Sequence, residues 1–226
     1  MTKTSKFLSV AFGVSMLALS VSMPRPAQAA TDQQALVDRA LVTINDLKHD
    51  KEFGNARELA LKARAILIVP RLYKGGFFVG GEGGSGVLMT QNSNGNWSDP
   101  AFYDLGAASF GFQFGIEQSE MVLFVMSQKA LDALNKDSFT LGADAGITVV
   151  TLGSNLSGAT TAAAGPDIVS WASSSGAFAG VSLSGSVIKP NSADDTAYYG
   201  HPVTLSDILY HRTVSNPQAS HLRDAM

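Results

Sequence analysis

The sequence contains no cysteine, and this absence excludes several kinds of chemistry at once. Disulfide bonds, thiol nucleophiles and thiolate metal ligands are ruled out, and so is a lipid anchor attached to an N-terminal cysteine. The fold must therefore be held together by noncovalent packing. A chain of 226 residues with 45% hydrophobic content is long enough for one sizeable core, and a second domain is not required.

Catalytic and metal-binding patterns are also missing. A serine nucleophile would need the frame G-x-S-x-G, but Val87 follows Gly84-Ser85-Gly86 where the last glycine should stand. The histidines have no metal-ligand spacing with one another or with a nearby acid; they are His49, His201, His211 and His221. We therefore predict that the protein is not an enzyme, with no catalytic residue, no metal site and no cofactor.

The N-terminal residues have the pattern of an export signal. Lys3 and Lys6 precede the uncharged apolar run from Phe7 to Val21, and Ala27-Gln28-Ala29 offers a small-x-small cleavage site. A membrane-spanning helix is the alternative, but the run is short and Pro24 follows it. We predict a secretory signal peptide over 1–29 and an exported protein of the periplasm or cell envelope without a lipid anchor. After residue 29 no apolar run approaches the roughly 18 residues that a membrane helix needs.

The charge of the chain is unevenly distributed. The signal contains basic residues and no acid, so the mature protein is more acidic than the formal charge of −3 for the whole chain, which argues against nucleic acid as a partner. The segment from Arg57 to Lys74 is basic in contrast, because it has one acid, Glu58, and five bases. The bases are Arg57, Lys62, Arg64, Arg71 and Lys74. Together with the aromatic residues Tyr73, Phe77 and Phe78, this segment predicts a surface for anionic lipid headgroups. The alternative is a solvated helix face followed by strand ends.

Helical signals occur at the two ends and in the middle of the chain. Thr31 with Gln34 forms a capping box, and the apolar positions from Leu36 to Leu47 make one helical stripe, which can pack on the protein or on a membrane; we favour packing. The expected helices are Thr31 to Asp50, Asn55 to Ala63, Ser127 to Leu134 and Thr204 to Tyr210. From Thr213 we expect a loose polar tail.

Most of the remaining chain has strand patterns. The clearest is Ser109 to Ile116, where large apolar residues alternate with small or polar ones. The other expected strands are Ile66 to Val69 (stopped by Pro70), Gly76 to Gly81, Gly86 to Gln91, Met121 to Met126, Phe139 to Leu141, Ala145 to Leu152, Asp167 to Ser173 and Ala177 to Ile188. Helices do not alternate with strands, so we predict an α+β fold that is mainly β. It would be an antiparallel sandwich or partly closed barrel, with short N-terminal, middle and C-terminal helices packed outside.

A glycine-rich stretch matches the nucleotide fingerprint G-x-G-x-x-G from Gly81 to Gly86. That fingerprint requires a helix after the last glycine, whose N-terminus holds the phosphates. Here Val87 to Thr90 reads as a strand, and Asn94-Gly95 is a hairpin turn signal. We therefore predict no nucleotide binding, and we interpret the glycines as positions that let a sheet bend.

Short motifs follow one another in a specific order over roughly Leu36 to Tyr210. They are Lys62 to Ile66, Gly75 to Phe77, Gly80 to Leu88, Trp97 to Pro100, Gly165-Pro166, Ser174 to Leu183 and Tyr198 to Gly200. In this order they resemble the SYLF domain, a lipid-binding family. The resemblance implies a single domain over 30–212, between the signal peptide and a tail over 213–226.

The resemblance also implies a function. Eukaryotic members bind phosphoinositides, partly through an amphipathic N-terminal helix, yeast relatives bind actin, and bacterial members are exported. We expect an exported, non-enzymatic module that binds anionic lipid at the envelope, and no actin partner. The alternative is an envelope module that is structural or binds protein or glycan without lipid specificity. Matched residues expected to carry the fold are Gly81, Gly83, Gly84, Ser85, Gly86, Trp97, Pro100, Gly176, Gly180, Tyr199 and Gly200.

Overall fold

The structure is a computed structural model that describes residues 31–50, 56–76, 79–110, 115–143, 146–152, 165–174 and 185–226. The proposed signal peptide, together with Phe77, Phe78, Gly176 and Gly180, lies outside these residues. The helices are α1 (Asp32–His49), α2 (Ala56–Lys62), α3 (Gln128–Leu134), α4 (Ser192–Tyr199), η2 (Asp207–His211), η3 (Pro217–Ala219) and α5 (Ser220–Asp224). The strands are β1 (Ala65–Gly76), β2 (Val79–Thr90), β3 (Ala101–Phe110), β4 (Gly115–Val125), β5 (Phe139–Thr140), β6 (Val149–Leu152), β7 (Ile168–Ser174) and β8 (Val187–Pro190).

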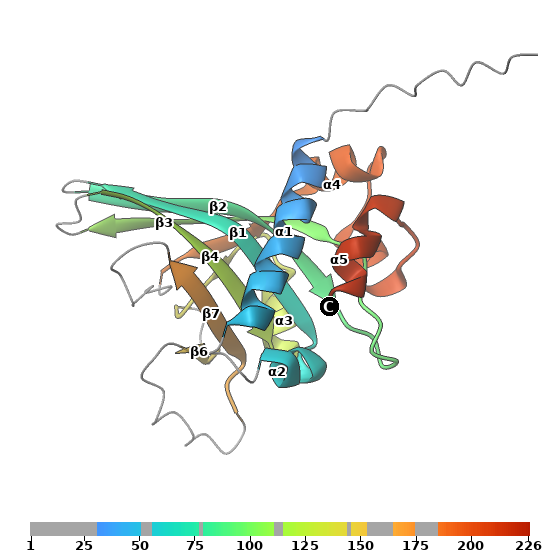
Figure 1. Cartoon of the computed structure of the whole chain (residues 1–226), viewed down its shortest axis with the longest axis horizontal. Coiled ribbons are helices and arrows are strands. Elements are labelled where there is room, and N and C mark those ends of the chain that lie inside the picture. The colour runs from blue at the N-terminus through green and yellow to red at the C-terminus, as the bar shows by residue number, and fades with distance from the viewer. Residues whose placement is uncertain are drawn as a thin grey trace, which may run out of the picture.

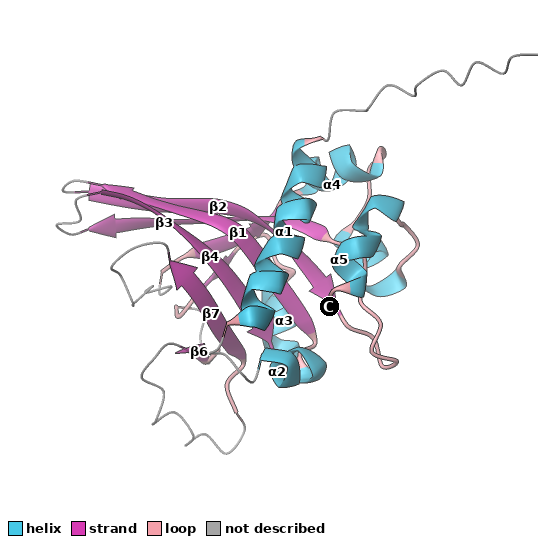
Figure 2. Cartoon of the chain, in the orientation of Figure 1, coloured by secondary structure: helices cyan, strands magenta, loops and turns pink. Residues whose placement is uncertain are grey.

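The strands form one eight-stranded sheet in the order β5-β8-β3-β2-β1-β4-β7-β6. All neighbours are antiparallel except β6 and β7, which run parallel. The sheet curves as a half-barrel and carries helices on its faces (Figures 1 and 2). The α+β prediction is confirmed, and of its two architectures the partly closed barrel is the one that the structure has.

Alternating side chains of the sheet build a separate core on each face. Ile66, Ile68 and Phe124 belong to the core beneath α1 and α2, together with Leu222 of α5. Leu67 and Leu123 belong to the opposite core, which packs against α3 and η2. Because both faces are covered, the central strands are apolar on both sides.

The first helix packs on the sheet, as favoured from its sequence. Thr31 Oγ1 accepts a hydrogen bond from the Gln34 N–H at 3.1 Å, which confirms the predicted N-terminal cap. The apolar stripe is buried, and Figure 1 shows α1 lying across one face of the sheet. Thr43 adds a polar contact, because its hydroxyl donates to Glu120 Oε1 of β4 at 3.0 Å.

The prediction that Pro70 stops the first strand is wrong. β1 continues to Gly76 through a β-bulge, in which Pro70 and Arg71 together oppose the single residue Glu120 of β4. A bulge leaves one residue without a ladder hydrogen bond, so proline, which has no N–H, is tolerated there. The bulge also offsets β1 by one residue, so that Leu72 is fully buried while Arg71 next to it is exposed.

The glycines of β2 make room for this bulge. A Cβ on Gly84 would stand 2.3 Å from the carbonyl oxygen of Arg71, and one on Gly86 would stand 2.5 Å from that of Ile68. Neither distance is sterically possible without a backbone shift. From the sequence we interpret these glycines as positions that let the sheet bend. The structure gives the specific reason, which is that the bulged strand β1 approaches them closely.

Several other strand predictions need correction. Gly76 to Gly81 and Gly86 to Gln91 are expected as two strands, but residues Val79–Thr90 form the continuous strand β2. The single strand expected over Ser109 to Ile116 is also wrong, because its described residues end β3 and begin β4, which do not pair. Of the strand expected over Ala177 to Ile188, the structure describes only the end, where β8 begins.

The residues from Thr213 onward are expected to be a loose tail, but the structure packs them against the domain. η3 and α5 bury Ala219 and Leu222, and α5 lies beside α1 (Figure 1). The short helix expected after Thr204 is present as η2, which begins at Asp207 and has the wider turn of a π-helix.

Candidate functional site

The basic segment predicted to contact lipid divides into two surfaces. Arg57 and Lys62 lie on α2, and Arg64 lies two residues beyond its end; all three side chains are exposed. Lys62 Nζ pairs with Glu58 Oε1 at 2.6 Å, whereas Arg64 Nη1 reaches the amide oxygen of Gln128 at 3.4 Å. We call Arg57, Leu61, Lys62 and Arg64 the α2 surface; Leu61 is 68% exposed and adds an apolar side chain to it.

Arg71 and Tyr73 lie much farther along β1. Arg71 lies seven residue steps beyond Arg64, a distance of about 23 Å at strand spacing. Lys74 belongs to β1, but its side chain is outside what the structure describes, as are Phe77 and Phe78. The predicted residues are therefore not one patch, and each surface has to be considered separately.

A cavity of about 460 Å³ adjoins the α2 surface between α1, α2 and the sheet. Its lining is mainly apolar, with Lys48, Asp50 and Arg57 as charged members. Asp50 is oriented by Trp171, whose indole N–H donates to Asp50 Oδ2 at 2.7 Å. The apolar lining residues are Ile44, Leu47, Ala56, Ala60, Ile66, Phe124 and Met226.

A second hollow, which we call the arginine groove, has a volume of about 500 Å³ and lies beside the first half of α1. Arg39 of α1 and Arg71 of β1 line it, and neither forms an ion pair with another described residue. The other lining residues are Leu36, Tyr73, Gly83, Gly84, Ser85, Asp104 and Leu105. Sequence reasoning did not select Arg39 or Asp104, because nothing in the sequence indicates that α1 and β3 meet Arg71.

The polar residues of the arginine groove are held in place. Ser85 Oγ donates to Asp104 Oδ1 at 2.9 Å, and Asn191 Nδ2 donates to Asp104 Oδ2 at 2.9 Å. Ser85 was predicted to carry the fold, and its contact with Asp104 links β2 to β3. Both carboxylate oxygens keep free lone pairs for a further donor, since each can accept more than one hydrogen bond.

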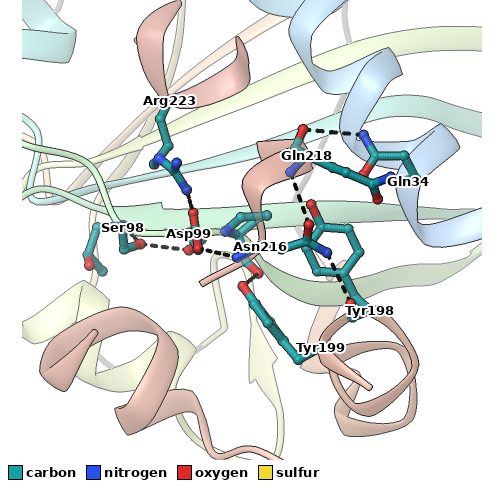
Figure 3. Close-up of polar contacts among 10 residues, drawn as sticks. Gln34, Ser98, Asp99, Tyr198, Tyr199, Asn216, Gln218 and Arg223 are labelled. Carbon is teal, nitrogen blue, oxygen red and sulfur yellow. Dashed lines mark hydrogen bonds and ion pairs between the residues drawn. The ribbon is translucent and has the colours of Figure 1, made fainter. Parts of the chain in front are cut away.

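The motif from Trp97 to Pro100 has a different role, which Figure 3 shows. Asp99 is buried, pairs with Arg223 of α5 and accepts the Asn216 N–H at 2.8 Å. Ser98 Oγ accepts the Thr90 N–H at 3.0 Å and donates to the Asp99 carbonyl at 2.8 Å. These bonds join the end of β2 and the residues just before β3 to the C-terminal segment.

Neighbouring motif residues support the same junction. Tyr199 donates its hydroxyl to the carbonyl oxygen of Pro100 at 2.8 Å (Figure 3). Gly200 ends α4 with a φ of 77°, a left-handed conformation that glycine adopts without strain. Trp97 forms an isolated β-bridge with Gln91.

One buried acid near this junction has a perturbed pKa. Burial raises the pKa of Asp195 from 3.8 to about 7. The Phe102 N–H, which donates to Asp195 Oδ1 at 2.8 Å, opposes that rise, whereas the charge of Asp194 adds to it. The carboxyl links α4 to β3 and lines neither hollow.

In the part of the chain that the structure describes, no cluster of three or more histidine or acidic side chains could hold a metal ion. No helix there is both long and apolar enough to cross a membrane.

Comparison with known proteins gives consistent matches. The family model Ysc84, described as "Las17-binding protein actin regulator", matches residues 106–226. Human SH3 domain-containing YSC84-like protein 1 is 31% identical over 166 residues, which cover 73% of this chain and 48% of that protein. Protein YSC84 of Saccharomyces cerevisiae is 29% identical over 206 residues, which cover 88% of this chain and 43% of the yeast protein. The chain thus spans about half the length of the curated relatives that it matches.

Proposed function

This chain belongs to the Ysc84 (SYLF) family, and from that membership we propose that it is a non-enzymatic module that is exported and binds anionic lipid at the cell envelope. The family model describes actin regulators, and the name of one yeast relative, LAS seventeen-binding protein 3, refers to Las17. For an exported chain we propose lipid in place of actin as the partner.

The observation that carries this proposal is the α2 surface. Arg57 and Arg64 are exposed, and each cation near an anionic membrane contributes about 1 kcal/mol to binding. Leu61 stands between them in sequence, with its side chain 68% exposed, and can enter the interface. The adjoining cavity, with its apolar lining, offers room for part of an acyl chain.

Flotation with vesicles tests the proposal. We expect the protein to float with phosphatidylglycerol-containing vesicles at low salt and to stay behind with phosphatidylcholine alone. The variant Arg57→Glu/Arg64→Glu should bind about tenfold or more weakly, because two attractive charges become repulsive. Its Tm should stay close to that of the parent, since both side chains are exposed.

Lys136→Glu is the matched control. Lys136 is exposed and follows α3, which packs on the other face of the sheet, so this change should leave flotation unaffected. Absence of flotation by the folded protein would exclude lipid binding. Equal flotation by the double variant and the parent would remove the α2 surface from the proposal.

A second candidate is an envelope module that is structural or binds protein or glycan without lipid specificity. The name of a yeast relative, LAS seventeen-binding protein 3, indicates protein binding by that relative. Retention of an envelope component in detergent, with no flotation on vesicles, would favour this candidate.

A further inference from the structure

The arginine groove has the features of a built binding site. Four elements supply it: α1 with Arg39, β1 with Arg71, β2 with Ser85 and β3 with Asp104. Its volume of about 500 Å³ falls in the usual range for small-molecule sites, roughly 300–1,000 Å³. The bulge in β1 is what leaves Arg71 exposed beside Tyr73, and Gly83 adds no side chain to fill the space.

The charges of the groove favour an anion. Two guanidinium groups share it with one carboxylate, so it carries a net positive charge in a chain that is acidic as a whole. Guanidinium groups match carboxylate and phosphate geometry, because their N–H donors form a planar fork. Among the described residues neither Arg39 nor Arg71 has an ion-pair partner that a ligand would have to displace.

The remaining groups favour an anion that also carries hydroxyls. Asp104 is fixed by Ser85 and Asn191, and its oxygens can still accept hydrogen bonds from a ligand. Tyr73 is 46% exposed and offers an aromatic face, and Leu36 adds an apolar contact. A sugar ring has hydroxyls for the carboxylate and a C–H face for the aromatic ring.

We propose that the arginine groove binds an anionic sugar, a saccharide unit that bears a carboxylate or a phosphate. Arg39 and Arg71 hold the charged group, and Asp104 with Ser85 binds the hydroxyls. The groove lies about 23 Å along β1 from the α2 surface. Sugar binding therefore does not depend on the lipid binding proposed above.

Isothermal titration of the purified protein tests the proposal, with glucuronate and glucose 6-phosphate as the anionic probes. We expect both to bind, and neutral glucose, inorganic phosphate and glycerol 3-phosphate each to bind at least tenfold more weakly. Arg71→Gln should weaken binding of both anionic sugars by at least tenfold, and Arg39→Gln should do the same. Arg64→Gln, the same change on the α2 surface, should leave the affinity unchanged.

The outcomes separate the alternatives. If neither anionic sugar binds the folded protein, or if Arg71→Gln, whose parent side chain is exposed, binds as tightly as the parent, the proposal is wrong. Equal binding of glycerol 3-phosphate would assign the groove to phospholipid headgroups and overturn the sugar assignment. Failure of vesicle flotation with retained sugar binding would reject the lipid proposal alone.

Discussion

Gly84 illustrates how a single residue accommodates an irregularity in a neighbouring strand. The carbonyl of Arg71 occupies the space where a side chain on Gly84 would start, because the bulge pushes this carbonyl over β2. The glycine pattern that resembles a nucleotide fingerprint in sequence is thus explained by backbone packing within the sheet. Glycine is required at this position because an added Cβ would collide with the backbone of β1, which cannot shift without moving the rest of the strand.

We predict that Gly84→Ala destabilises the protein by about 1–3 kcal/mol, the usual cost of overpacking. A Cβ at Gly81 would meet its nearest neighbour at 3.6 Å, an ordinary contact, so Gly81→Ala serves as the control. Thermal unfolding should show a Tm several degrees lower for Gly84→Ala only. Equal Tm values for the two variants would show that the bulge relaxes without cost.

Asp195 gives a second prediction at this scale. Its pKa in the folded protein is raised to about 7 from 3.8, mainly by burial. The protonated form is therefore favoured in the native state, and this contribution to stability is complete below about pH 4 and lost as the pH rises through 7. The Tm of the parent should fall more between pH 5 and pH 8 than that of Asp195→Asn, which cannot ionise. Parallel profiles of Tm against pH would contradict the shift.

At the scale of elements, α1 is part of the core and not a free amphipathic helix. Its apolar stripe faces the sheet, and its first turn is tied to η3, because Gln34 Nε2 donates to the Gln218 carbonyl at 3.4 Å (Figure 3). Any contact of this stripe with a membrane would require α1 to leave the sheet and expose the core beneath it. This is why the lipid proposal rests on the α2 surface.

Two substitutions in α1 test its packing in solution. Ile44 is 3% exposed, and Ile44→Ala should cost about 2–5 kcal/mol in the free energy of unfolding. Val42 is 54% exposed, and Val42→Ala should stay within about 0.5 kcal/mol of the parent. Chemical denaturation measures both. Equal stability of the two variants would mean that α1 is not docked on the sheet.

Sequence reasoning identified elements where the signal is local. The Thr31 cap is determined by residues within one turn and is present, and the helix expected from Ser127 is present with Ser127 as its N-terminal cap. It failed at Pro70, because tolerance of proline depends on a bulge that only the pairing of β1 with two neighbours defines. The arginine groove was beyond prediction for the same reason: Arg39, Arg71 and Asp104 are distant in sequence and meet only through the sheet order.

For the whole molecule, the C-terminal segment closes the domain. Asp99, two residues before β3, is buried, pairs with Arg223 and accepts the Asn216 N–H. Leu222 completes the core beneath α1, and Lys48 Nζ donates to the carbonyl of Ala225. The C-terminal segment thus connects the first helix to the sheet and makes the domain one unit.

Arg223→Met should destabilise the protein by about 3 kcal/mol, because it leaves the Asp99 carboxylate buried without its cation. Adding Asp99→Asn should recover part of that loss, since the uncompensated charge is then removed. Arg57→Met, at an exposed position of α2, is the control and should have little effect. Urea denaturation of the four proteins provides the measurement. An unchanged midpoint for Arg223→Met would show that the ion pair does not contribute.

The position of β1 also has a consequence for folding kinetics. β2 follows β1 directly and pairs with it, and β3 then pairs with β2, so both contacts are local hairpins; β4, on the other side of β1, comes only after β3. Until β4 arrives, an apolar strand from the centre of the sheet is an open edge that can pair with another chain. Such non-local pairing is slow, so the open edge persists while β2, β3 and β4 assemble. The yield of refolding should then fall as protein concentration rises, with intermolecular strand pairing as the competing reaction.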